Sequence, residues 1–447
     1  MSGTQHKSSS SNQKRIVLVM QGGGSLGAYE CGVCKVLAKH DIKFDIMAGT
    51  SIGAINASII ASRYEKRDGI KNSVKRCEDF WMDLAAAGNN IPSPSPFAFL
   101  PYKEKSELSA AYSLLYGNQR AFTPLWIIPG GIPYYYFFNS PYLYNVGKFK
   151  KTISEYVDFA KLGPHSQNPQ GNKQLGIESN DSEKNSKNDN NSIDIATSSS
   201  SVNYNETKNS DNRNNASDNN KNQDVDNNSN EVPRLILTAT NVQTGEPVIF
   251  DSAKINITVD HVMASAGYAV YGLPWTKIND SYLWDGAFVH NTPLRAATRA
   301  IEAPKIVYVT DVFPRKQKNL PRSMPETYHR IRDLLFTDRS IEETAEISET
   351  AKKDLLLIEQ MHDLMVSEIS TNTKSKSKFN KIEEEYNNLV HDKQGLITEK
   401  IVHIQRHESP GRHFVYEDAD FSIDTIKELI IQGQEDAEDA MEQADIR

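Results

Sequence analysis

RIVLVMQGGGSLGAYECG, residues 15–32, joins an apolar, β-branched run to a cluster of glycines and then to a stretch that suits a helix. Ile16–Met20 has the composition of a buried strand, and Ala28–Lys39 carries apolar residues at helical spacing. Phe44–Ala48 and Ile52–Tyr64 repeat this strand–helix order. Two such units in succession predict a mainly parallel sheet with helices on its faces.

Strand-like segments continue far along the chain. Leu235–Thr240 and Lys305–Val312 are apolar runs typical of strands. Asn241–Phe250 predicts a strand–turn–strand, and Tyr282–Ala287 ends another strand. The fold class that this pattern predicts is α/β, a three-layer α/β/α arrangement with a mainly parallel central sheet, followed by a helical C-terminal extension.

The 447-residue chain divides by composition. Residues 1–14 form a polar tail, and residues 164–232 are rich in Asn, Asp and Ser with few large apolar side chains. Such segments bury too little apolar surface to offset their chain entropy, so we expect both to be disordered. We therefore expect one α/β domain over residues 15–312, interrupted by this insertion, and a mostly helical region over residues 313–447.

The C-terminal region shows helical periodicity. Residues 325–398 are charged, which favours a solvated surface, and a homodimer through these helices is the sharper alternative. Residues 401–404 predict a short strand. A final amphipathic helix follows, and four of its apolar residues are expected to face the body: Ile426, Leu429, Ile430 and Ile431.

Charge and cysteine content indicate which classes of partner and which cellular compartment to expect. The chain has 50 Lys and Arg against 58 Asp and Glu, a formal net charge of −8, which does not favour nucleic-acid binding. Cys31, Cys34 and Cys77 are too few for a disulfide framework, and no apolar run reaches the ~20 residues of a spanning helix. The start of the chain lacks the apolar core of a secretory signal. We expect a cytoplasmic protein, with peripheral contact at the inner membrane face as an option.

Gly49-Thr50-Ser51-Ile52-Gly53 lies between the second predicted strand and its helix, where a G-x-S-x-G pattern has meaning. A serine on such a sharp turn projects its hydroxyl away from the sheet, and only glycine-like residues fit the crowded flanking positions. The following helix directs its positive N-terminus at the serine. Ser51 is therefore the candidate nucleophile, with Gly49 and Gly53 shaping the turn.

A serine hydroxyl needs a base to accept its proton. His261 and His290 are nearest to plausible loops, but neither lies in a catalytic pattern. Asp285 follows an apolar run and precedes a Gly-Ala pair, so we expect it at the end of a parallel strand, although an ordinary turn is the alternative. Because Ser51 occupies the same kind of position, the sheet can bring the two together, and a desolvated carboxylate is a stronger base than one in water.

The glycine loop permits two interpretations. Gly22-x-Gly24-x-x-Gly27 after a strand satisfies the dinucleotide-binding pattern, which needs an acidic residue at the end of the second strand, but Asp45 begins that strand instead. The alternative is an oxyanion hole of backbone N–H groups beside Ser51. The oxyanion interpretation fits better, and a nucleotide-binding oxidoreductase is the runner-up.

Taken together, GGGSLGAYECG, GTSIG and DGAFVHNTPL resemble, in this order, the three signatures of patatin-like phospholipases. The segments RLILTATNVQTGEPVIFDS and DHVMASAG are similar to those that separate the last two signatures. The resemblance covers residues 15–163 and 233–312, and the region after 313 is similar to an extra C-terminal part in a microbial branch. It implies hydrolysis of lipid acyl esters, those of phospholipids or lysophospholipids, without a metal or cofactor.

The resemblance also implies residue roles. Ser51 would be the nucleophile and Asp285 the general base of a Ser–Asp dyad that works through an acyl-enzyme. The remaining site residues that it implies are an oxyanion loop and the support of the Asp motif: Gly22, Gly23, Gly24 and Ser25 for the loop, and Gly286, Ala287 and Asn291 for the support. One departure is that Gly267 and Tyr268 stand where the family often has an Ala-x-Pro pattern, which bears on acyl preference more than on activity.

Three features stay open at this level. Aromatic residues gather in residues 126–144, where they suit a lid or a lipid–water interface, and packing under a long loop is the alternative. Cys31-x-x-Cys34 favours two buried thiols over a redox pair. For the whole protein, a non-catalytic membrane-associated scaffold is a further alternative to an enzyme with a lipid ester as its partner.

Overall fold

The computed structural model describes residues 14–65, 67–88, 101–127, 140–164, 232–369, 376–407 and 416–445. All of these residues belong to one compact unit. The expectations for the N-terminal tail and for the Asn/Asp/Ser-rich insertion lie outside the described residues, as does most of the aromatic segment.

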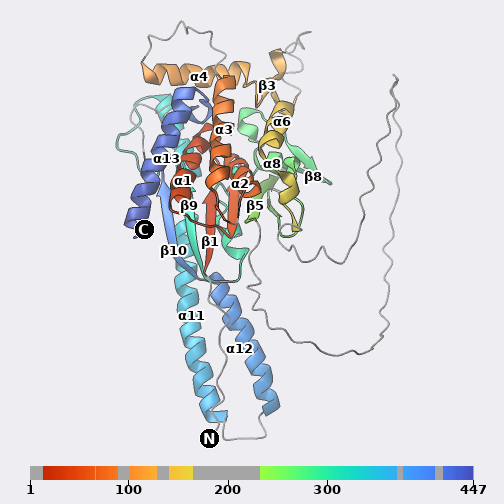
Figure 1. The fold of residues 1–447 in the computed structure, drawn as a ribbon, viewed down its shortest axis with the longest axis vertical. Helices are drawn as coiled ribbons and strands as arrows, with labels where there is room; N and C mark the ends of the chain where they lie inside the picture. Colours follow the sequence, from red (N-terminus) through yellow and green to blue (C-terminus); the bar gives the residue numbers. More distant parts are fainter. Residues whose placement is uncertain are drawn as a thin grey trace, which may run out of the picture. The chain divides into compact units, whose positions relative to one another are not determined.

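The described residues form a central sheet of eight strands (Figure 1). Its order is β10 (Thr398–Gln405), β9 (Lys305–Asp311), β1 (Arg15–Met20), β2 (Ile46–Thr50), β5 (Arg234–Asn241), β8 (Ser281–Asp285) and β7 (Thr276–Ile278), with β6 (Pro247–Asp251) also paired to β5. The five strands from β10 to β5 are parallel. The pairs that involve β6, β7 and β8 are antiparallel. The sheet is therefore mainly parallel, as the strand–helix pattern predicts.

Alternate side chains of the central strands enter two separate cores, because successive residues of a strand point to opposite faces. Leu18 and Met20 of β1 pack with the core that includes residues of six helices: α1 (Gly27–Lys39), α2 (Ile52–Ser62), α3 (Lys71–Gly88), α6 (Gly147–Tyr156), α8 (Val259–Ser265) and α13 (Ile423–Gln443). Val17 and Val19 pack on the other face, with Leu294 of α9 (Leu294–Arg299). Helices on both faces of the sheet give the predicted three-layer α/β/α fold.

The remaining elements lie around this frame. Between α3 and β5 are α4 (Tyr102–Tyr116), the short antiparallel pair β3 (Thr123–Pro124) and β4 (Tyr144–Asn145), and α6 (Gly147–Tyr156). After β9 come α10 (Met324–Phe336), α11 (Ser340–Ile369) and α12 (Lys376–Leu396), and the last two run side by side (Figure 1). None of the helices in the described ranges has the length and apolarity needed to cross a bilayer.

The C-terminal region completes the same core. Strand β10 extends the parallel sheet beyond β9, and α13 packs along α1. Ile426, Leu429 and Ile430 are buried against the body, as the periodicity predicts. Ile431 is 54% exposed, so the expectation for this residue is wrong. It follows Ile430 directly on the helix and therefore points about 100° away from it.

Candidate active site

Two strands meet end to end at the candidate site. Residues 236–240 of β5 pair with β6 along one edge of the strand. Strands β2 and β8 pair with parts of the same stretch, so both must lie along the opposite edge of β5. Thr50, the last residue of β2, pairs with Thr238, and Asp285, the last residue of β8, pairs with Ala239. Neighbouring residues of a strand are about 3.3 Å apart along its axis. This shared edge brings the two strand ends together.

The direction of β8 corrects the sequence-based picture. Asp285 was expected at the end of a parallel strand, but β8 runs antiparallel to β5. The strand approaches from outside the carboxyl edge of the sheet and ends facing β2, so Asp285 reaches the predicted place from the opposite direction. The alternation of apolar residues does not distinguish the two directions, since both strand types have the same side-chain period.

Ser51 lies on a strained turn between β2 and α2. Its backbone has φ 56° and ψ −123°, a conformation that non-glycine residues rarely adopt. Its N–H donates to Ser265 Oγ at 3.1 Å, which ties the turn to the end of α8. A Cβ atom on Gly49 would lie 2.3 Å from the carbonyl oxygen of Gly53, and one on Gly53 would lie 2.6 Å from that of Met20. Both glycines are therefore required by close backbone contacts on either side of the turn.

Asp285 is fully buried beside this turn. Its Oδ1 accepts the N–H of Ala287 at 2.9 Å, whereas Oδ2 is buried and accepts no hydrogen bond of normal geometry from the described residues. Burial raises the pKa of the carboxyl group to about 7, and the Ser51 side chain is the first of two contacts that oppose this shift, ahead of the Ala287 N–H. The Ser51 side chain thus lies close enough to the Asp285 carboxyl group to oppose the rise in its pKa, and burial brings that pKa near neutral pH.

The glycine loop lies against Ser51 from the first strand. A Cβ atom on Gly22 would lie 2.9 Å from Ser51 Cβ, so the two backbones are in contact. The Gly22 N–H donates to the carbonyl oxygen of Asn291 at 3.2 Å, and the Ser25 hydroxyl donates to the carbonyl oxygen of Glu417 at 3.1 Å. The Gly22 N–H is therefore a poorer candidate for an oxyanion donor, and the N–H groups of Gly23, Gly24 and Ser25 remain candidates.

The loop is held from behind by a buried polar network. Glu30 accepts hydrogen bonds from the Gln21 N–H at 2.7 Å, the Thr310 hydroxyl at 2.8 Å and the Asn56 amide at 2.9 Å. Burial raises the pKa of Glu30 to about 8 despite these three donors, which oppose the shift. The Gln21 side chain in turn accepts the N–H of Val312 at 2.8 Å. These contacts make the end of β1 rigid where the glycines begin.

Segment η8 (Glu417–Ala419), in the C-terminal region, packs on the outer side of the loop. Gly24 has φ 57°, and a Cβ atom there would lie 2.3 Å from the carbonyl oxygen of Asp418. The Asp418 carboxylate also accepts the Tyr271 hydroxyl at 2.8 Å. A region that follows the predicted domain therefore contributes directly to the site, which local sequence patterns did not indicate.

An apolar pocket opens beside Ser51 and the glycine loop. The empty space inside it, counting its open mouth, is about 980 Å³. Its lining includes Ser51, the three loop glycines, Asn291 and Asp418, and is otherwise dominated by aliphatic and aromatic side chains: Ile52, Ile55, Leu84, Leu114, Phe122, Tyr144, Val146, Phe149, Tyr268, Tyr271, Leu273, Phe313, Phe336 and Phe421. Such a lining suits a hydrocarbon chain with its polar end at Ser51.

Other candidates from the sequence lie elsewhere. His261 Nδ1 accepts the Thr258 N–H at 3.0 Å in a cap of α8, and the His290 side chain is exposed. The Asp45 carboxylate accepts the Ile16 N–H at 2.8 Å and pairs with Arg15, at the start of the sheet strands and far from the glycine loop. This position does not suit a ribose clamp. Within the described ranges, no group of three His, Cys, Asp or Glu side chains is arranged to hold a metal ion.

Sequence reasoning did not identify the residues that hold the backbone around Ser51 and Asp285 in place. Ser265 accepts the N–H of Ser51, and the Thr50 and Thr238 hydroxyls are 2.6 Å apart beneath it. A Cβ atom on Gly286 would lie 2.5 Å from the carbonyl oxygen of Thr238. The A-S pair at the end of α8 was a visible signal for Ser265, but the two threonines are ordinary strand residues in the sequence.

Comparison with family models identifies one family. The family model for patatin-like phospholipases matches residues 18–298. A patatin-like phospholipase domain-containing protein of Coccidioides immitis (strain RS) is 35% identical over 74 residues, which are 15% of this chain and 10% of that protein. Triacylglycerol lipase SDP1L of Arabidopsis thaliana is 39% identical over 49 residues, 11% of this chain and 6% of the lipase. The chain thus spans a tenth or less of the curated relatives that it matches.

Among solved structures, VipD from Legionella pneumophila matches with a TM-score of 0.29 and 11% identity, covering 94% of this chain and 67% of VipD.

Proposed function

Because the chain belongs to the patatin-like phospholipase family, we propose that it is a serine acyl hydrolase that cleaves carboxylic esters of lipids through Ser51 and Asp285. The observation that carries this proposal is the strained Ser51 turn, which contacts a buried carboxyl group on one side and borders an apolar pocket on the other. The triacylglycerol lipase name of one relative belongs to that protein and agrees with ester hydrolysis in general.

The first half of the reaction transfers the acyl group to Ser51. Asp285 accepts the hydroxyl proton while Ser51 Oγ forms a bond to the ester carbonyl carbon. N–H groups among those of Gly23, Gly24 and Ser25 donate to the resulting oxyanion, the kind of contact whose loss typically lowers turnover ~10²–10³-fold. The tetrahedral intermediate then collapses, the ester C–O bond breaks, and the leaving alkoxide takes the proton from Asp285.

The second half releases the fatty acid. Asp285, again ionised, accepts a proton from water as the water oxygen attacks the acyl-enzyme carbonyl carbon. The new tetrahedral intermediate breaks its bond to Ser51 Oγ, and Ser51 recovers its proton from Asp285. A dyad with one carboxyl base suits esters, because an alcohol leaves more readily than an amine. A carboxyl pKa of about 7 lets the same group accept and return the proton near neutral pH.

The pocket supports an acyl chain as the bound part of the substrate. Its lining is mainly aromatic and aliphatic, and apart from Ser51 and the tyrosine hydroxyls its polar side chains are those of Asn291 and Asp418. A phospholipid or a lysophospholipid both present such a chain with an ester at its end. We propose this class of lipid, and the head group is left to experiment.

A lipid panel with mass-spectrometric detection of released fatty acids tests the proposal. We expect wild-type protein to hydrolyse at least one lipid ester in the presence of a chelator. Ser51→Ala and Asp285→Asn should each lower kcat by roughly a thousandfold or more, because the two side chains act as one unit.

His290→Ala is the matched control, since that side chain is exposed, and it should retain wild-type turnover. Undiminished turnover in Ser51→Ala would contradict the mechanism. Tight NAD(P) binding by calorimetry without any ester cleavage would instead support the oxidoreductase alternative.

A further inference from the structure

Helix α10 faces the body with its charged side. His329, Arg332 and Asp333 are buried, each no more than 9% exposed. The opposite side carries an apolar stripe at helical spacing, whose exposed fractions are 60% for Met324, 54% for Tyr328, 46% for Ile331 and 71% for Leu335. An amphipathic helix on a soluble protein normally has the reverse arrangement, so the outward stripe needs an explanation.

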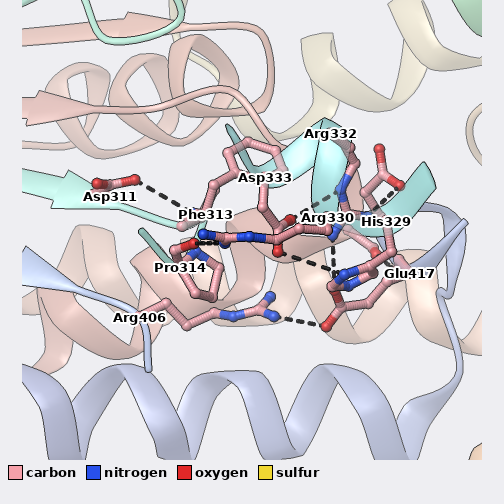
Figure 2. Close-up of polar contacts among 12 residues, drawn as sticks. Asp311, Phe313, Pro314, His329, Arg330, Arg332, Asp333, Arg406 and Glu417 are labelled. Carbon is pink, nitrogen blue, oxygen red and sulfur yellow. Dashed lines mark hydrogen bonds and ion pairs between the residues drawn. The ribbon is translucent and has the colours of Figure 1, made fainter. Parts of the chain in front are cut away.

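A buried ion network sets this orientation (Figure 2). Arg332 Nη2 lies 3.0 Å from Glu417 and 2.9 Å from Asp333, and His329 Nε2 lies 3.0 Å from Glu417. Arg406, the residue after β10, lies 2.7 Å from the other oxygen of Glu417. Rotating α10 to bury its apolar stripe would leave Glu417 in the interior without Arg332, which is costly. The stripe therefore stays on the surface.

The C-terminal end of α10 borders the pocket on the side of the helix that faces the body. Phe336, the last residue of α10, lines the pocket, and its ring centroid is 6.1 Å from that of Tyr268, another lining residue. The Tyr268 ring stacks on Phe288 at 5.5 Å, and Phe288 is 42% exposed. Ring contacts thus join the end of α10 and the pocket lining to the partly exposed Phe288 ring.

Charge around the stripe favours an anionic partner. Residues 313–339 contain seven Lys and Arg against three Asp and Glu, a formal +4 in a chain whose net charge is −8. Lys316, Arg322 and Arg339 are exposed within this segment. Basic residues beside an apolar helix face are the pattern of a helix that lies in the interface of an anionic bilayer.

A second exposed apolar face provides a contrast. On α11, Leu356, Leu357, Met361 and Leu364 are all more than half exposed. That helix contains eight Asp and Glu against two Lys, so an anionic surface would repel it. Two exposed apolar helix faces of the molecule therefore differ in their charged neighbours, one on α10 among basic residues and one on α11 among acidic residues.

We propose that α10 seats the protein on an anionic lipid bilayer, with the apolar stripe in the interface and the pocket mouth facing the lipid. This inference rests on the proposed lipid ester hydrolysis, which gives membrane binding its purpose. The binding itself does not require catalytic turnover. The bilayer would supply acyl chains to the pocket directly, without passage of a lipid through water. Each exposed cation near such a surface strengthens binding about fivefold at physiological ionic strength.

Co-sedimentation with vesicles tests the proposal. The full chain carrying Ser51→Ala is used as the parent, so that hydrolysis does not consume the lipid. We expect it to bind phosphatidylcholine–phosphatidylserine vesicles more tightly than pure phosphatidylcholine vesicles, and less tightly as salt is raised. Adding Ile331→Ser and Leu335→Ser should weaken binding about tenfold or more, because two apolar side chains leave the interface.

Two further variants separate charge from general apolar contact. Adding Lys316→Glu and Arg322→Glu should remove the preference for phosphatidylserine. Adding Leu357→Ser and Leu364→Ser on α11 removes comparable apolar area and should leave binding unchanged. Thermal unfolding of each variant checks that these exposed positions do not alter the fold.

The inference about membrane binding can fail while the proposed function still holds. Vesicle binding that is equal in the parent and in the Ile331→Ser/Leu335→Ser variant would overturn it. So would an α10-dependent dimer in size-exclusion chromatography combined with no vesicle binding, because a second copy would then cover the stripe. Hydrolysis of a dispersed short-chain ester by the protein with Ser51 intact reports on the dyad independently of either result.

Discussion

At the scale of single residues, the site depends on two side chains whose environments differ. Ser51 sits on a strained turn at the pocket, whereas Asp285 is fully buried and does not line it. The strain at Ser51 persists because Ser265, Gly49 and Gly53 hold the surrounding backbone. Because the Asp285 carboxyl group is buried, its pKa is set by the protein interior and not by contact with bulk water.

The raised pKa of Asp285 predicts the pH dependence of hydrolysis. The base must be ionised, so kcat/KM should rise about tenfold for each pH unit below 7 and become level above it. Stability has the opposite sign, because a folded pKa of about 7 lies above the ordinary value of 3.8. The folded state therefore loses stability as pH rises between these two values. Initial rates on a dispersed short-chain ester across this range provide the measurement.

Glu30 supplies the control for that profile. Its pKa is raised to about 8 by burial under the glycine loop, so it would titrate in a neighbouring range. Glu30→Gln removes this titration while keeping the shape of the side chain. We expect the acidic limb of the profile to persist in this variant. An acidic limb that disappears with Glu30 would contradict the assignment to Asp285.

At the scale of elements, the crossing of α1 and α13 shows how the C-terminal helix is joined to the core. A Cβ atom on Gly32 would lie 2.0 Å from the carbonyl oxygen of Ile430, and one on Gly433 would lie 2.0 Å from that of Tyr29. Each helix thus places a glycine against the backbone of the other. The two backbones approach closely because no side chain stands between them.

Gly32→Ala should separate these helices. The new methyl group overlaps backbone rather than a flexible side chain, so the free energy of unfolding should fall by roughly 1–3 kcal/mol. Ile431→Ala on the exposed side of α13 is the control and should have little effect. Denaturant unfolding followed by circular dichroism measures both, and equal stability of the two variants would argue against the tight crossing.

At the scale of the whole molecule, the ion network joins three distant parts of the chain. Glu417 of η8 meets Arg332 of α10 and Arg406 beyond β10, and its main chain accepts the Ser25 hydroxyl from the glycine loop. Arg406 and Arg332, with His329, hold the pKa of Glu417 well below its ordinary value against the effect of burial. The same residue thus links the orientation of α10 to the oxyanion loop.

Glu417→Ala should be strongly destabilising. It leaves two buried guanidinium groups without this partner, a change that typically costs about 3–5 kcal/mol. Because the folded pKa of Glu417 is depressed, its contribution is present above the ordinary pKa of 4.5 and is lost as pH falls further. The difference in Tm between variant and wild type should therefore be large at neutral pH and shrink in acid.

The exposed ion pair of Arg315 and Glu342 is the matched control for this prediction. Both side chains are about half exposed, so solvent screens their attraction. Glu342→Ala should leave Tm unchanged at neutral pH. A Glu417→Ala protein as stable as wild type would show that the network does not hold η8 in place.

Local patterns in the chain were sufficient for the fold class, the strand–helix order and the Ser51 turn, because side-chain period and glycine spacing depend on neighbouring residues. They were also sufficient to select Asp285 as a candidate. They did not indicate that β8 is antiparallel, because period and composition are the same for either strand direction. Nor did they indicate that Ile431 faces solvent.

Only the tertiary structure decided which distant residues meet. The shared edge of β5 sets β2 against β8, and so Ser51 against Asp285. Burial raises the pKa of that carboxyl group, and burial is a property of the packed molecule rather than of the Asp-Gly pair. The outward stripe of α10 likewise follows from ion pairs with residues far along the chain. Proximity and desolvation arise from long-range packing, and a short stretch of sequence contains neither.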